Sequence, residues 1–122
     1  MSPELLLPAL RGLAEPTRLR IVALLSGWIG PRQGPLRCDE PGLCLTDLEL
    51  AVGLPHPLVS HHVRTLCEAG LVESERRGRW TIYRIRPERL RPLGRVLLRM
   101  AAGQGVADTP EAAELDEWSI AV

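Results

Sequence analysis

Apolar residues recur at helical spacing in three long stretches of the chain. The stretch 3–13 places leucines on one face, and 16–28 is apolar enough to be a central core helix. The stretch 87–104 has apolar residues at three- and four-residue intervals along one side. Pro8 falls inside the first stretch, where we expect a kink or a shorter helix. The pattern therefore predicts long helices near both ends of the chain.

Two shorter helices are expected in the middle of the chain. Thr46 and Glu49 have the spacing of a capping box, which predicts that a helix starts at Thr46. A second helix is expected over 57–69. Gly53 and Gly70 follow the two helices, and glycine at this position is typical of a helix C-terminus. The short turn between them, Leu54-Pro55-His56, gives the spacing of a helix-turn-helix.

A hairpin follows directly after the second of these helices. Residues 71–75 and 80–85 predict two strands, joined by Arg76-Arg77-Gly78-Arg79. The predicted fold is therefore mainly α with a small β-hairpin: a winged helix-turn-helix with the element order α-α-α-α-β-β-α.

Charge is distributed unevenly, although the formal net charge is zero. All fifteen basic residues are arginine, and none lies beyond Arg99. Five of the fifteen acidic residues lie in the stretch 106–122. We therefore expect a basic DNA-binding and dimerisation domain over 1–105 and an acidic C-terminal tail over 106–122.

Composition narrows the class of protein. No apolar run approaches the ~20 residues that cross a bilayer, and the first residues do not resemble a signal peptide. Three cysteines without an export signal predict reduced thiols in a cytoplasmic protein. Cys44 with His61 or His62 could be imagined as nucleophile and base, but no phosphate loop or paired acids accompany them. An enzyme is not expected, whereas a winged protein-interaction module remains an alternative.

The helix over 57–69 has the residue types of a DNA-recognition helix. Such a helix places its N-terminal half in the major groove. Residues there should hydrogen-bond to bases and phosphates or be small. The candidates for DNA contact on this helix are His56, Pro57, Ser60, His61 and Arg64.

The DNA-binding hypothesis also assigns a buried face to this helix and a set of arginines to the hairpin. On the recognition helix, the residues expected on the buried side are Leu58, Val59, Val63 and Leu66, with His62 at the border. On the hairpin, the arginines suited to contact the DNA backbone or minor groove are Arg76, Arg77 and Arg79.

Three separate blocks of sequence resemble the ArsR/SmtB-type metalloregulators. They are LAEPTRLRI at 13–21, SHHVRTLCEAGLV at 60–72, and RGRW at 77–80 with Tyr83. The resemblance covers about residues 10–100. It implies a homodimeric winged-helix repressor that binds a palindromic operator in double-stranded DNA and leaves it when an inducer binds. It also implies that the first and last long helices pair across the twofold axis of the dimer.

The resemblance also indicates where an inducer could bind. One family site lies at the start of the third helix. Here GLCLTDL at 42–48 keeps Cys44 and Asp47, but Thr46 replaces the second cysteine. The other family site lies on the last long helix and needs histidine and carboxylates. That helix has no histidine and only Glu88, so the second site is expected to be absent.

The predicted inducer site combines Cys44 with Cys38, six residues earlier. The positive end of a helix favours thiolate, and two sulfurs suit a soft, thiophilic ion. We predict As(III) or Sb(III) as the inducer, no cofactor for folding, and Cys67 as a bystander. Three alternatives stay open: a redox or persulfide sensor using the same cysteines, a zinc or cadmium site that adds Asp47, and no effector at these residues.

Overall fold

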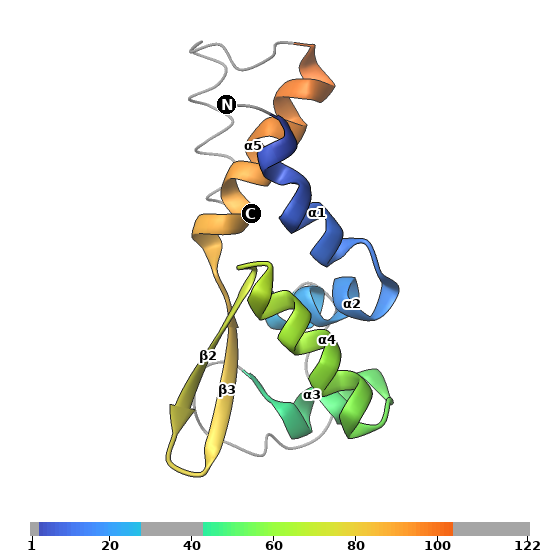
Figure 1. The fold of residues 1–122 in the computed structure, drawn as a ribbon, viewed down its shortest axis with the longest axis vertical. Helices are drawn as coiled ribbons and strands as arrows, with labels where there is room; N and C mark the ends of the chain where they lie inside the picture. Colours follow the sequence, from blue (N-terminus) through green and yellow to red (C-terminus); the bar gives the residue numbers. More distant parts are fainter. Residues whose placement is uncertain (1–2, 28–42, 104–122) are drawn as a thin grey trace.

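The computed structural model describes residues 3–27 and 43–103. The elements in these ranges are η1 (Pro3–Leu6), α1 (Leu7–Leu13), α2 (Pro16–Leu25), β1 (Leu43–Cys44), α3 (Leu45–Val52), α4 (His56–Glu68), β2 (Val72–Arg77), β3 (Trp80–Ile85) and α5 (Pro87–Ala102). Helices α1 and α5 lie side by side at one end, and the β2–β3 hairpin projects from the other (Figure 1). The predicted winged helix-turn-helix is confirmed, with one additional strand.

The first two predicted helices are present with shifted ends. Residues 3–13 form a 3-10 turn followed by α1, and Pro8 lies in the first turn of α1, where a missing N–H is tolerated. Helix α2 starts at Pro16, and the Glu15 carboxylate caps it by accepting a hydrogen bond from the Arg18 backbone N–H at 2.9 Å. This cap was not predicted. The helix ends at Leu25, with Ser26 as its C-cap residue, so the predicted end near Trp28 is about three residues too late.

The predicted capping box at Thr46 is wrong. Leu43 and Cys44 form a short strand, β1, which pairs with Tyr83 and Ile82 of β3. The chain is therefore extended up to Cys44, which becomes the N-cap residue of α3. Thr46 already lies inside the helix, so its hydroxyl is not placed to cap it.

The sheet has three antiparallel strands in the order β1-β3-β2. Pairing between β2 and β3 continues to Arg77 opposite Trp80. The predicted four-residue connection is therefore too long: Arg76 and Arg77 belong to β2. Gly78 and Arg79 make the turn, with Gly78 at a φ of 59° that favours glycine.

Helices α4 and α5 match their predictions closely. Helix α4 starts one residue before the predicted position, and Gly70 follows its end with a φ of 78°. Helix α5 ends at Ala102, and Gly103 adopts the same left-handed conformation with a φ of 72°. No helix within 3–27 and 43–103 is long and apolar enough to span a membrane.

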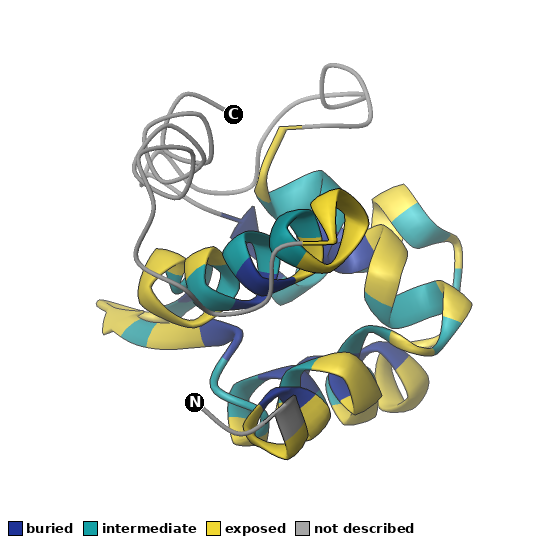
Figure 2. Ribbon diagram, turned by 90° about the horizontal axis from the view of Figure 1, so that it is seen from above, coloured by how far each residue is buried: buried dark blue, intermediate teal, exposed yellow. Residues whose placement is uncertain are grey.

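Within the described residues, the core consists of a large cluster, a small cluster and the buried pair of Cys44 and Ile82. The large cluster joins α2, β1, α3, α4 and β2, with Ile21, Leu48 and Leu66 fully buried. The small cluster consists of Leu6, Leu93 and Val96, between η1 and α5. Buried positions lie on the inner faces of the helices, and exposed positions cover the outer faces (Figure 2).

Candidate nucleic-acid interface

Helix α4 is held in place by one apolar face. Val59, Val63 and Leu66 are at most 1 % exposed and belong to the large cluster. Burying three such side chains contributes several kcal/mol, at roughly 1.5–3 kcal/mol each. Leu58 was expected on this side, but it is 48 % exposed, so that prediction is wrong. The apolar face fixes which residues of α4 face outward.

The five predicted DNA-contacting residues of this helix lie together on α4. His56, Pro57, His61 and Arg64 are exposed, and Ser60 is partly buried. The spacing of Pro57, His61 and Arg64 is four and three residues, which places them along one side of the helix. This side therefore offers imidazole and guanidinium donors to solvent.

The start of α4 is tied to α3 by a contact that was not predicted. The Nδ1 atom of His56 pairs with Oε1 of Glu49, and His56 is still 66 % exposed. The pair spans the turn of the helix-turn-helix and restrains the angle between its two helices. Nε2 is then the ring nitrogen of His56 that a base or phosphate could engage.

Two of the wing arginines pack over the turn of the hairpin. Arg76 donates from Nε to the Gly78 carbonyl at 3.0 Å and from a terminal nitrogen to the Thr81 hydroxyl at 3.3 Å. The Arg79 guanidinium lies 5.9 Å from the centre of the Trp80 ring, a cation–π distance. Both arginines are exposed, so their charge faces solvent at the tip of the wing.

The third wing arginine is partly neutralised. Arg77 lies 2.9 Å from Glu75, measured from Nε to Oε1, and Glu75 also pairs with Arg84 on β3. A local carboxylate reduces the attraction of Arg77 for a phosphate. The three arginines, which were predicted to act alike, therefore differ in their surroundings: Arg77 is paired with a carboxylate, whereas Arg76 and Arg79 contact neutral groups.

Cys44 occupies a buried position at the start of α3. It is 2 % exposed and packs with Ile82 and the partly buried Trp80. Asp47, 7 % exposed, lies one helical turn further along. Within the described ranges no group of three or more histidine, cysteine and acidic side chains could hold a metal ion. Cys38, the predicted second ligand, lies outside the described residues, as does the acidic tail.

Cys67 lies apart from this region, near the end of α4. Burial raises the pKa of its thiol, and the negative charge of Glu68 adds to the effect. A raised pKa disfavours the thiolate that binds soft ions and reacts with oxidants. Its predicted role as a bystander fits this environment.

Comparison with known proteins gives matches over most of the chain. A family described as bacterial regulatory protein, arsR family, matches residues 38–74. The arsenic resistance transcriptional regulator ArsR1 of Pseudomonas putida is 34 % identical over 87 residues, covering 70 % of this chain and 59 % of that protein. The transcriptional repressor SmtB of Mycobacterium tuberculosis is 38 % identical over 76 residues, covering 62 % and 47 %. The chain thus spans about half the length of these curated relatives.

A solved structure is similar over a longer range. The antimony-specific transcriptional repressor AntR is 33 % identical, with a TM-score of 0.51, and the match covers 83 % of this chain and 82 % of that one.

Proposed function

Because this chain belongs to the ArsR family of bacterial regulatory proteins, we propose that it is a homodimeric, cytoplasmic repressor that binds operator DNA and releases it when a thiophilic ion binds. The family consists of transcriptional regulators, not enzymes, as expected from the sequence.

The polar and basic side chains on the exposed side of α4 are the main support for DNA binding. His61 and Arg64 face outward on a helix whose opposite face is anchored in the core. Arg76 and Arg79 add positive charge at the tip of the neighbouring wing. In a dimer, two copies of α4 about one DNA turn apart would enter successive major grooves. The arginines would contribute affinity through phosphate contacts.

Exposed apolar residues on η1 and α5 support the dimer. Leu5 is 68 % exposed, Leu97 46 % and Met100 53 %. They lie on the two elements that share the small cluster, and a second chain could cover them. We therefore assign the dimer interface to this helix pair.

We place the inducer between Cys44 and Cys38, whose sulfur atoms would bind it. The similarity to an arsenic resistance regulator and to an antimony-specific repressor supports As(III) or Sb(III) as the inducer. Cys44 is buried, so its sulfur becomes a ligand only if the side chain leaves the contact with Ile82. That movement disturbs the β1–β3 pairing and the start of α3, which packs against α4. A coupling of a few kcal/mol between the two sites is enough to release DNA.

A gel-shift titration tests this function. DNA from upstream of the gene is bound by the parent, Cys38→Ser, Cys44→Ser and the matched control Cys67→Ser, and each complex is titrated with arsenite, antimonite, zinc and a persulfide donor. We expect arsenite or antimonite to release the parent and the control, but neither of the other variants. No DNA binding at low salt would overturn the repressor, and equal release of all four proteins would overturn the cysteine site. Release by zinc or persulfide alone would assign a different inducer.

A further inference from the structure

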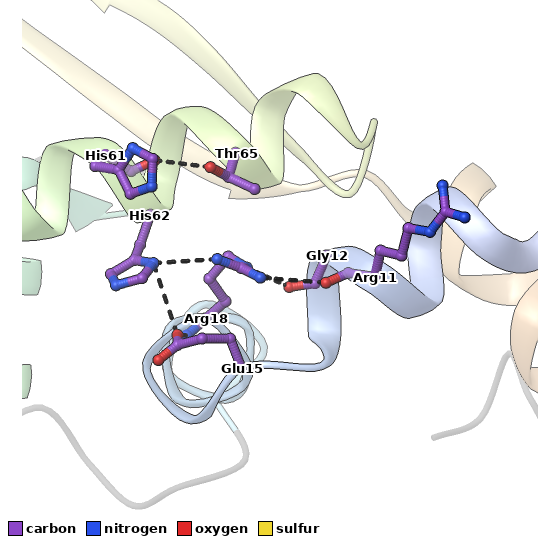
Figure 3. A network of polar contacts seen from close by, with 7 residues as sticks. All are labelled: Arg11, Gly12, Glu15, Arg18, His61, His62 and Thr65. Atoms are coloured by element: carbon purple, nitrogen blue, oxygen red, sulfur yellow. Dashed lines mark hydrogen bonds and ion pairs between the residues drawn. The ribbon is translucent and has the colours of Figure 1, made fainter.

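One arginine joins the end of α1 to the middle of α4 (Figure 3). Arg18, in the first turn of α2, donates from Nε to the Gly12 carbonyl at 2.7 Å and from a terminal nitrogen to the Arg11 carbonyl at 3.2 Å. Both carbonyls belong to the last turn of α1, and the Arg11 carbonyl also accepts the backbone N–H of Ala14 at 3.3 Å. The Arg18 side chain therefore fixes the C-terminal end of α1.

The same guanidinium contacts α4. Its other terminal nitrogen lies 3.3 Å from Nδ1 of His62, and Oε2 of Glu15 lies 3.6 Å from that Nδ1. Arginine can only donate hydrogen bonds, so the Arg18–His62 hydrogen bond requires the tautomer of His62 that carries its proton on Nε2. The His62 side chain is only 15 % exposed. Its orientation is therefore set by Arg18 and not by solvent.

A direct packing contact reinforces this connection. Gly12 is buried, and a Cβ atom there would lie 3.1 Å from both the Ala69 side chain and the Leu71 side chain. The backbone of α1 thus rests on the segment that follows α4 with no space for a side chain. The chain holds α1 against α4 at two places, through Gly12 at the end of α4 and through Arg18 in its middle.

His62 is next to the candidate DNA-contacting surface. His61 is exposed on the adjacent position, and the two rings are 5.4 Å apart between centroids. A shift of α4 at His62 would therefore change how His61 and Arg64 meet DNA.

We propose that Arg18 is a positioning residue for DNA binding, which links α1 to the recognition helix through His62. The inference rests on the proposed function, which places α1 in the dimer interface and α4 on DNA. Movement of α1 at the interface is passed to α4 because Arg18 binds the end of one helix and a side chain of the other. Dimer geometry and operator affinity are coupled by this contact.

Four variants test the link. Arg18→Met removes the guanidinium, and His62→Phe removes its acceptor while keeping a ring. His62→Asn places an oxygen near the position of Nδ1 and so retains an acceptor. Arg20→Met, on the exposed side of α2, controls for the loss of one positive charge. Operator affinity is measured by fluorescence anisotropy well below each unfolding midpoint, with the fold checked by circular dichroism.

Loss of the contact should weaken operator binding about tenfold, within the range of typical coupling between sites. We expect this in Arg18→Met and in His62→Phe, and no further loss in the double variant, because both changes remove the same contact. His62→Asn and Arg20→Met should stay within about twofold of the parent. Nitrogen-15 spectra should show an unprotonated Nδ1 in His62 of the parent and a mixture of tautomers in Arg18→Met.

Two results would overturn the inference alone: parental affinity in Arg18→Met and His62→Phe, or additive losses in the double variant. If Arg18→Met does not fold, the operator affinities of His62→Phe and His62→Asn are compared instead. Equal affinities of these two variants would then overturn the inference. A parent that binds no operator would overturn the proposed function and, with it, this inference.

Discussion

The two ends of the molecule differ in how completely one chain buries its apolar residues. Of the residues that the structure describes, nine form the buried cluster around α2, α3, α4 and the sheet, whereas three form the cluster of η1 and α5. Among the described residues, the α1–α5 end exposes five large apolar side chains, those of Leu5, Leu7, Leu10, Leu97 and Met100, whereas α2, α3 and α4 expose one each, at Leu19, Leu50 and Leu58. The end that carries α4 and the wing therefore holds the larger core, whereas the α1–α5 end leaves more apolar surface exposed, which we propose a second chain covers.

Because of this difference in burial, we expect the two ends to be stabilised in different ways. The larger core should depend on intrachain packing alone, whereas the α1–α5 end should depend on protein concentration through dimerisation.

The largest effect is expected in the larger core. Leu66→Ala removes a fully buried side chain of α4 and should lower the free energy of unfolding by about 3 kcal/mol. Denaturant unfolding at two protein concentrations measures the loss, which should be the same at both. Leu58→Ala, 48 % exposed on the same helix, should cost less than about 1 kcal/mol. Equal losses in the two variants would contradict the assigned burial.

Next in size is a charge placed at the α1–α5 end. Leu97→Glu, on α5, should weaken dimerisation by more than about 100-fold, since a carboxylate would be buried there without a partner. Analytical ultracentrifugation gives the dissociation constant. Leu50→Glu adds the same charge at a leucine of α3 that is 61 % exposed, and it should leave the dimer intact. If both variants dimerise equally well, the interface lies elsewhere.

Removing the outward-facing arginine of α4 should reduce DNA binding. Arg64→Ala is expected to weaken operator binding about tenfold, through loss of a base or phosphate contact worth about 1–3 kcal/mol. Affinity for operator and for unrelated DNA of equal length is compared by anisotropy. Unchanged affinity for the operator would remove Arg64 from the interface.

The wing should make a smaller, sequence-independent contribution. Arg79→Ala should weaken binding to operator and unrelated DNA alike, by about fivefold, and reduce the dependence on log salt concentration by about one. A titration series in salt gives that slope. A loss confined to the operator would indicate that Arg79 reads sequence.

The smallest effect concerns the cap of α2. Burial alone would raise the pKa of Glu15, but the hydrogen bond from the Arg18 N–H and the electrostatic effect of His62 and Arg18 hold the pKa below its ordinary value of 4.5. Folding therefore favours the ionised form. This contribution to stability is complete above the unfolded pKa and is lost as the pH falls through the lower folded pKa.

Glu15→Gln should thus cost roughly 0.3–1 kcal/mol at neutral pH, because the amide oxygen can still accept the Arg18 N–H but the favourable negative charge at the helix N-terminus is lost. The difference from the parent should shrink in acid, and thermal melts at neutral pH and below the ordinary pKa measure it. A cost that stays constant over this range would show that the Glu15 charge does not contribute.

The sequence predicted most helices because their apolar periodicity is strong. Helix α4 was placed within one residue, since its buried face and Gly70 mark it clearly, and the five DNA candidates on it therefore share one helix. Strand β1 has only two residues and no periodicity, so the start of α3 was misassigned to Thr46. The Arg18–His62 contact joins positions 44 residues apart, and no local pattern can predict a contact that only the tertiary fold creates.

A footprint of the parent protein on DNA upstream of its own gene tests the central claim most directly. The claim predicts two protected half-sites whose centres lie about one helical turn, roughly 10 base pairs, apart or a multiple of that distance. At a concentration near the dissociation constant of the parent, Arg64→Ala should protect both half-sites only weakly, because its affinity is about tenfold lower. Absence of protection at low salt, or equal protection of any DNA by both proteins, would contradict a dimer that reads DNA through α4.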